Sequence, residues 1–251
     1  TGMEKHSDRY VDWMEGAGEA FSNTMLHTMA RFPRASLEAA LNQLDNHDHS
    51  RFLTRTNHVV GRLGELGYRM ADEGVDKAVL RAAVLLQMTW PGAPGIYYGD
   101  EAGLTGFTDP DNRRPFPWGR EDAQLQDYYG QLGRLRRQRS VLRRGSLRLL
   151  RAHQGLLIYG RMNASETLLM VINQSGEEKM VTLATQELDG IGGSRARRLI
   201  QTWSEGYNLG QQELILPEKE LTLHLKAREA AIYEIGFPAL PKELRQELKL
   251  R

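Results

Sequence analysis

The sequence contains no cysteine, so it can form neither a disulfide framework nor a thiolate metal site. It also lacks an apolar run of the about 18 residues that a membrane-spanning helix needs, and no signal peptide is recognisable. The formal net charge is only +1, so no bulk field of one sign points to a nucleic acid. Together these absences favour a cytoplasmic protein whose partners include neither nucleic acid nor a membrane.

What is present fits a globular protein. Of 251 residues, 40% are hydrophobic and 26% are charged. This length is enough for one large domain or for two domains of ordinary size.

The stretch at residues 44–51, LDNHDHSR, concentrates the polar chemistry of the chain. A short apolar lead at residues 39–44 precedes it and predicts a buried strand. Chemistry in α/β barrels lies at the carboxyl ends of such strands, which favours a functional site here. The alternative is the polar start of a helix, capped by Asp45 or Asn46.

A second strand supports the first interpretation. Asp76 is a typical helix cap before an apolar face that includes Val79 and Leu86, and Trp90-Pro91-Gly92 ends that helix. Residues 93–98, APGIYY, then predict a short buried strand, followed by the polar run Gly99-Asp100-Glu101. In a right-handed strand–helix–strand unit, both polar clusters meet at one edge of a parallel sheet.

Other segments have clear local signals. Spacing predicts a helix over 13–31, with Phe21, Met25 and Met29 inward, which Phe32-Pro33 ends. Glycines at 61–74 predict a loop with short helical pieces, and residues 103–118 predict a long loop. Residues 128–139 predict a helix with Leu132 and Leu135 inward. The tail at 241–251 predicts a charged or frayed helix. Beyond about residue 145, apolar runs separated by turn residues predict antiparallel strands at 156–159, 168–172, 180–183, 199–203, 214–216, 221–225 and 230–235.

Eight arginines lie between Arg134 and Arg151. A nucleic-acid surface is one interpretation, but no aromatic residues alternate with these arginines, and acidic residues precede them. A solvated helix face with ion pairs between domains is the better prediction.

Three motifs resemble one known family. Residues 44–53 (LDNHDHSRFL) resemble the fourth sequence region of the α-amylase family, glycoside hydrolase family 13, and residues 90–101 (WPGAPGIYYGDE) resemble its eighth barrel strand. Residues 109–115 (DPDNRRP) and the helix at 21–32 are most similar to the neopullulanase and cyclomaltodextrinase branch. The resemblance implies an α/β fold: the C-terminal part of a (β/α)8 TIM barrel at 1–144, about strand 7 to helix 8, followed by an all-β antiparallel sandwich domain at 145–251.

The resemblance also implies a retaining glycosidase that acts on α-1,4-linked, α-1,6-linked or cyclic maltodextrins. By match to the motifs, Asp48 is the catalytic carboxylate that grips sugar hydroxyls in the transition state, and His47 binds the same sugar unit. Asp109 and Arg113 match sugar-binding positions of the neopullulanase branch. Arg51 is expected to orient neighbouring groups, and Glu101 to be structural.

The sequence departs from the family in one large respect. The nucleophile and general acid lie at the ends of barrel strands four and five, and nothing in this chain matches those regions. The chain is therefore expected to begin after strand six and to need a missing N-terminal part of the same protein. The expected partners are an α-glucan oligosaccharide and a second copy of the chain in a homodimer. No cofactor is expected, although the family leaves room for a structural calcium elsewhere in the full-length protein.

Two alternatives remain open at this point. His47 and His49 would share one face of an extended strand, and two histidines with a carboxylate form the ligand set of non-haem iron. A non-catalytic amylase-like subunit or carbohydrate-binding module would also explain the absent acids.

Overall fold

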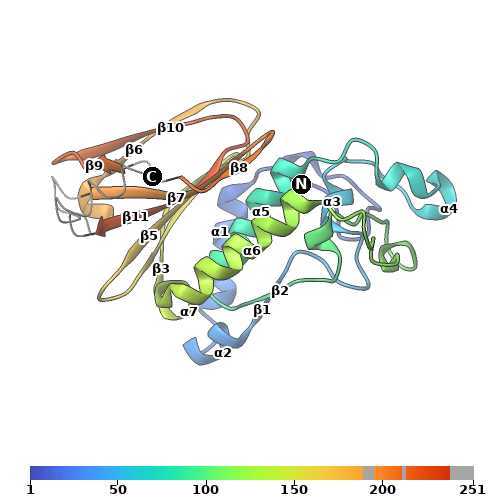
Figure 1. The fold of residues 1–251 in the computed structure, drawn as a ribbon, viewed down its shortest axis with the longest axis horizontal. Helices are drawn as coiled ribbons and strands as arrows, with labels where there is room; N and C mark the ends of the chain where they lie inside the picture. The colour runs from blue at the N-terminus through green and yellow to red at the C-terminus, as the bar shows by residue number, and fades with distance from the viewer. Residues whose placement is uncertain (189–194, 211–212, 238–251) are drawn as a thin grey trace.

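The computed structural model describes residues 1–188, 195–210 and 213–237 (Figure 1). One half of the molecule holds the helices and long loops, and the other half holds antiparallel strands. The helices are α1 Gly18–Met29, α2 Arg34–Ala39, α3 Phe52–Arg55, α4 Leu63–Leu66, α5 Lys77–Thr89, α6 Ala123–Gln138 and α7 Ser140–Arg144. Short 3-10 turns are η1 Asp12–Met14, η2 Tyr68–Ala71, η3 Asp100–Ala102, η4 Asp111–Arg113 and η5 Thr185–Leu188.

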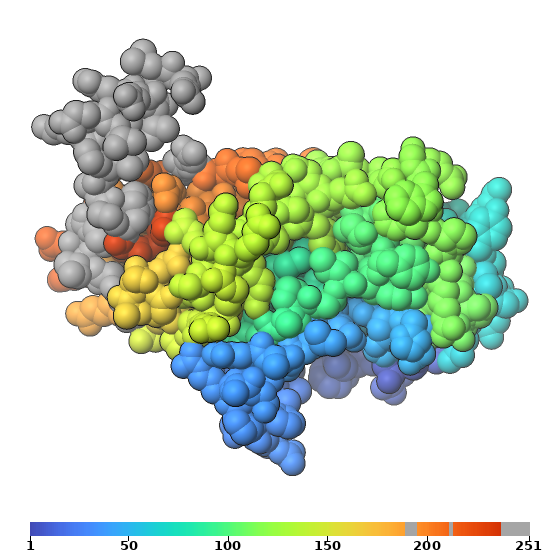
Figure 2. Space-filling model, turned by 60° about the horizontal axis from the view of Figure 1, so that its bottom comes forward, coloured from blue at the N-terminus to red at the C-terminus, as the bar shows by residue number. Residues whose placement is uncertain are grey.

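Two strands, β1 Leu41–Gln43 and β2 Ala93–Gly95, pair in parallel, with Gln43 opposite Gly95. The predicted burial of both strands was wrong: Leu41 is 66% exposed, and β2 is half-buried and ends before Ile96 and Tyr98, which are 45% and 41% exposed. The first two residues of the predicted apolar lead are not part of the strand, because Ala39 ends α2 and Ala40 follows it. Within the described residues β1 has one neighbouring strand, so its other edge stays open. Figure 2 shows α2 and the adjoining chain projecting from the body of the molecule.

The helix α5 forms as its cap signal predicts. The Asp76 carboxylate accepts the backbone N–H groups of Ala78 at 2.8 Å and Val79 at 3.2 Å, and the helix stops before Pro91. The apolar face also includes Leu80, Val84 and Leu85, as the sequence predicts, and these three side chains are fully buried, whereas Val79 and Leu86 are half-buried. The helix packs against α6 on one side and the antiparallel sheet on another, so almost all of its surface is covered.

The remaining strands are antiparallel. They are β3 Ser146–His153, β4 Leu156–Met162, β5 Thr167–Asn173, β6 Lys179–Ala184, β7 Arg195–Trp203, β8 Gly206–Asn208, β9 Glu213–Ile215, β10 Glu220–Leu225 and β11 Ala230–Phe237. The larger sheet has the order β3-β4-β5-β11-β7-β8, with β9 also paired to β7, and β6 pairs with β10 separately. All seven predicted strands are present, whereas β3 and β8 were missed.

Alternation along β4 and β5 sends side chains to two separate cores. Leu157 and Tyr159 join the core shared with α5 and α6, whereas Ile158 and Val171 join the core shared with β6 and β10. The first core contains residues from both sides of the predicted boundary at 144–145, so the two predicted domains share it. Their division at that point stays a prediction.

The other local predictions also have outcomes. Phe21, Met25 and Met29 of α1 pack against the first core, and α4 and η2 are the short helical pieces in the glycine-spaced loop. Arg139 donates to Glu166 at 2.7 Å and Glu234 at 2.8 Å, which confirms ion pairing between the helical and the β-rich parts. The predicted tail helix at 241–251 lies outside the described residues.

Candidate functional site

Both polar clusters lie at the same edge of the parallel strand pair, as predicted. Residues 44–51 follow β1 and residues 96–101 follow β2. Arg51 from the first cluster and Asp100 from the second form an ion pair of 2.8 Å. We call the buried residues around this ion pair the base of the site, where two chain segments far apart in sequence meet.

Arg51 forms the centre of this base. Its side chain is completely buried, and its guanidinium also donates to the carbonyl oxygens of Tyr98 at 2.6 Å and Asn112 at 2.9 Å. The guanidinium carbon lies 3.9 Å from the centre of the Tyr97 ring, within cation–π range. Arg51 cannot reach a ligand from this position, so it orients neighbouring groups, as the sequence suggested.

Two buried carboxyl groups complete the base. Burial raises the pKa of Asp100 well above its usual value, and the nearby Asp45 carboxylate raises it further, against the opposing effect of Arg51. Asp45 accepts the backbone N–H of Phe52 at 2.5 Å, the first residue of α3. The helix-cap alternative for Asp45 or Asn46 was wrong, because the stretch follows β1 and the N-cap position of α3 is Arg51, whereas Asp45 contacts the helix start from seven residues away.

The four predicted site residues lie together above the base, and we call them the rim: His47, Asp48, Asp109 and Arg113. Arg113 contacts the Asp109 carboxylate at 2.9 Å and donates to the backbone oxygen of His47 at 3.2 Å. The Asp48 carboxylate lies 3.4 Å from His47 Nε2 and 3.9 Å from Arg113 Nη2. Both distances exceed the about 2.7–2.9 Å of charge-assisted hydrogen bonds, so the Asp48 carboxylate is only loosely held.

The rim and the base differ sharply in exposure. The Asp48 and His47 side chains are 63% and 65% exposed, whereas those of Arg51 and Asp100 are 0% and 7% exposed. Charged groups of the rim can therefore meet a dissolved ligand, and those of the base cannot.

Two residues that sequence reasoning did not single out hold the rim in place. Asn112 donates to the backbone oxygens of Asn46 at 3.2 Å and His49 at 2.6 Å. His6 Nδ1 lies 3.1 Å from the backbone oxygen of Asp48. Asn112 lies within the DPDNRRP motif, which was a usable signal, but nothing in the local sequence around His6 indicates this long-range contact. Glu101 accepts the N–H of Gly99 at 2.9 Å, in keeping with a structural part.

The metal alternative finds no support in this arrangement. The His47 side chain is paired with Asp48, while the His49 ring packs edge-on against the His6 ring at 5.7 Å. Burial lowers the pKa of His49. In the described parts of the chain, no three His, Cys, Asp or Glu side chains are placed to hold a metal ion.

Among the helices of the described residues, none is long and apolar enough to cross a membrane.

A cavity of about 330 Å³ lies away from the rim, between α1, α5 and the larger sheet. Its lining is mainly apolar and includes Phe21, Val79, Leu86 and Leu157. None of the four rim residues contributes to it. The rim is thus an open surface site and not an enclosed cavity.

Comparisons with known proteins agree with the motifs. A family model described as "Alpha amylase, catalytic domain" matches residues 3–218. An amylopullulanase of Thermoanaerobacter thermohydrosulfuricus is 38% identical over 182 residues, and the match covers 64% of this chain and 12% of that protein. Neopullulanase 2 of Thermoactinomyces vulgaris is 34% identical, with 68% of this chain and 27% of that protein covered. The chain therefore spans only a minor part of these relatives.

Solved structures show the same likeness. An α-amylase of Geobacillus thermoleovorans in complex with acarbose superposes with a TM-score of 0.70 at 25% identity, covering 88% of this chain and 44% of that one. A cyclomaltodextrinase superposes with a TM-score of 0.62 at 28% identity, covering 91% of this chain and 35% of that one.

Proposed function

The chain belongs to the α-amylase catalytic-domain family, and from this premise we propose that it forms part of a retaining α-glucan hydrolase. Its substrates are α-1,4-linked, α-1,6-linked or cyclic maltodextrins. The observation that carries the proposal is the rim, where His47, Asp48, Asp109 and Arg113 converge on one exposed surface at the ends of two parallel strands. The acarbose complex of the related α-amylase supports an α-glucan-like ligand.

The geometry suits Asp48 to bind sugar hydroxyls. Its carboxylate is exposed and held only by long contacts, so it can accept hydrogen bonds from a ligand without first breaking strong ones. Hydrogen bonds to an ionised acceptor are about twice as strong as neutral ones, and those that tighten as the sugar ring distorts lower the barrier rather than only the binding constant. His47 binds the same sugar unit, and Arg113 with Asp109 binds a neighbouring one.

The nucleophile and the general acid come, in this proposal, from an upstream segment outside this sequence. Residues 1–144 then complete a (β/α)8 barrel with that segment, and residues 145–251 form the β-sandwich domain. The two-stranded parallel sheet and the exposed Leu41 support this assembly, because a barrel strand needs partners on both edges.

The test measures kcat and KM on an α-1,4-glucan in the enzyme assembled from this chain and its upstream segment. We expect Asp48→Asn to lower kcat about 10³-fold with a smaller change in KM, because it replaces the ionised acceptor by a neutral amide of the same shape. His47→Ala should have a milder effect. Asp12→Asn, at an exposed aspartate of η1, is the matched control.

The alternative of a non-catalytic amylase-like subunit makes a different prediction. Glucan binding would then persist while the assembled protein hydrolysed nothing. A near-normal kcat in Asp48→Asn would show instead that the cluster is structural.

A further inference from the structure

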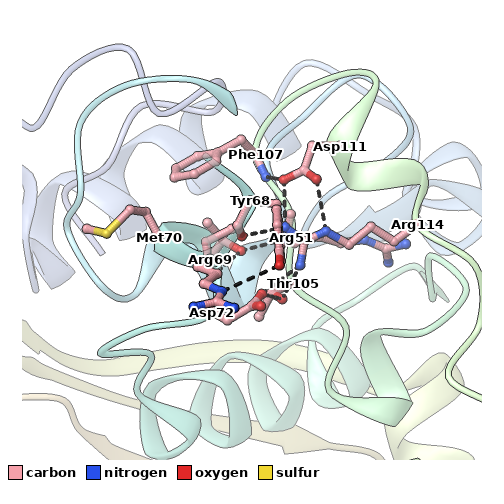
Figure 3. Close-up of polar contacts among 12 residues, drawn as sticks. Arg51, Tyr68, Arg69, Met70, Asp72, Thr105, Phe107, Asp111 and Arg114 are labelled. Carbon is pink, nitrogen blue, oxygen red and sulfur yellow. Dashed lines mark hydrogen bonds and ion pairs between the residues drawn. The ribbon is translucent and has the colours of Figure 1, made fainter. Parts of the chain in front are cut away.

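One arginine next to the rim has a hydrogen-bonding arrangement that neither the motifs nor the proposed mechanism explains. The Arg114 guanidinium donates through Nε and Nη2 to both oxygens of Asp111, at 2.9 and 2.8 Å. It also reaches Asp72 at 2.6 Å, Thr105 Oγ1 at 3.1 Å and the backbone oxygen of Tyr68 at 2.8 Å (Figure 3). All five N–H groups of the side chain therefore have an acceptor.

These contacts join three segments that are distant in sequence. The first is the turn at 68–72, the second is the loop at 105–107, and the third is η4 with its flanks. The Arg114 side chain is 20% exposed and that of Asp111 only 7%. A fully exposed ion pair contributes little, but a bidentate pair in this partly buried setting can fix a loop.

Each of the three residues of η4 contacts a different part of the site. Asp111 is held by Arg114 and also accepts the N–H of Phe107 at 2.8 Å. Asn112 donates to the backbone of residues 46 and 49, and Arg113 extends toward the Asp48 carboxylate. Because these residues are consecutive in a single turn, fixing Asp111 fixes where the next two side chains point.

We propose that Arg114 is a positioning residue, which acts through Asp111 to set Arg113 and Asp109 against Asp48. Its guanidinium is fully used by protein acceptors, so it contacts no substrate. Only the kinetic consequence of this inference rests on the function proposed above. Lysine cannot replace this arginine, because an ammonium group offers a point charge and three donors instead of a planar fork.

The kinetic test is a double-variant cycle in the assembled enzyme, with Arg114→Lys, Arg113→Ala and the pair. If Arg114 acts by placing Arg113 and Asp109, Arg114→Lys should raise KM for a maltodextrin at least fivefold in the wild type but less than about twofold once Arg113 is absent. A general loss of stability would lower activity by the same factor in both backgrounds, and equal factors would overturn the proposal. Arg120→Lys, an exposed arginine on the same loop, should change neither constant.

The second test needs no activity. Amide hydrogen exchange of the full chain should be at least tenfold faster in Arg114→Lys at Phe107 and at residues 46–49, while α6 stays unchanged. Asp72→Asn, at a half-exposed partner, should cause a smaller change at the same amides and serves if Arg114→Lys does not fold. Unchanged exchange in a folded variant would overturn the positioning inference. Accelerated exchange in a protein that hydrolyses no glucan would sustain it while the proposed function fails.

Discussion

The buried pair of Arg51 and Asp100 makes the sharpest stability prediction. We expect Arg51→Met to keep the apolar packing on Tyr97 but to remove three hydrogen bonds, those to Asp100, Tyr98 and Asn112. It leaves the Asp100 carboxyl buried beside Asp45 without its ion-pair partner. Removing one partner of a buried pair costs about 3–5 kcal/mol.

For a domain of this size, that loss corresponds to a fall in melting temperature of roughly 6–20 °C. The assay is unfolding by urea and by heat at one pH. Arg62→Met is the matched control, because Arg62 and Asp8 form an ion pair of 2.6 Å whose side chains are 55% and 43% exposed. That variant should lose less than about 1 kcal/mol.

A double variant separates charge from packing. Arg51→Met combined with Asp100→Asn removes both charges of the pair, so it should recover part of the loss, since the Asp100 carboxylate no longer lies buried without its partner. The reasoning would be refuted if Arg51→Met lost no more free energy of unfolding than Arg62→Met.

The remaining predictions concern pH and a helix cap. Because the folded-state pKa of Asp100 is raised, folding holds that proton more tightly than the unfolded chain does, so this group's contribution is complete at acidic pH and is lost as the pH rises through the folded-state pKa. Arg51→Met raises that pKa further and should therefore be more destabilising at pH 8 than at pH 5, as unfolding at the two pH values would reveal. Asp76→Ala removes the cap of α5 and should cost about 1 kcal/mol in urea unfolding, whereas Asp76→Asn should cost only a few tenths. Equal losses in the two Asp76 variants would mean that the side-chain oxygen is not what stabilises the helix start.

Several features could be predicted because their causes are local. Asp76 before an apolar face and Pro91 after it set the limits of α5, and alternation with turn residues located the antiparallel strands. The four rim residues were chosen by resemblance to two short family motifs; the structure brings them together, and their part in sugar binding stays a prediction. The family assignment also rests on contiguous motifs.

The tertiary structure decided what each polar residue does. Arg51 and Arg113 are the same residue type in neighbouring parts of one site, yet the first is completely buried and the second is 47% exposed. The two side chains differ in exposure because Arg51 is enclosed by residues 97–100 and 112, whereas Arg113 ends η4 and extends from its two buried residues, Asp111 and Asn112, toward the surface. His6, Asn112 and Arg114 likewise gain their roles from partners tens of residues away. Local pattern determines helices, strands and motifs, whereas burial and pairing depend on which distant segments pack together, and those contacts leave no periodic signal in the sequence.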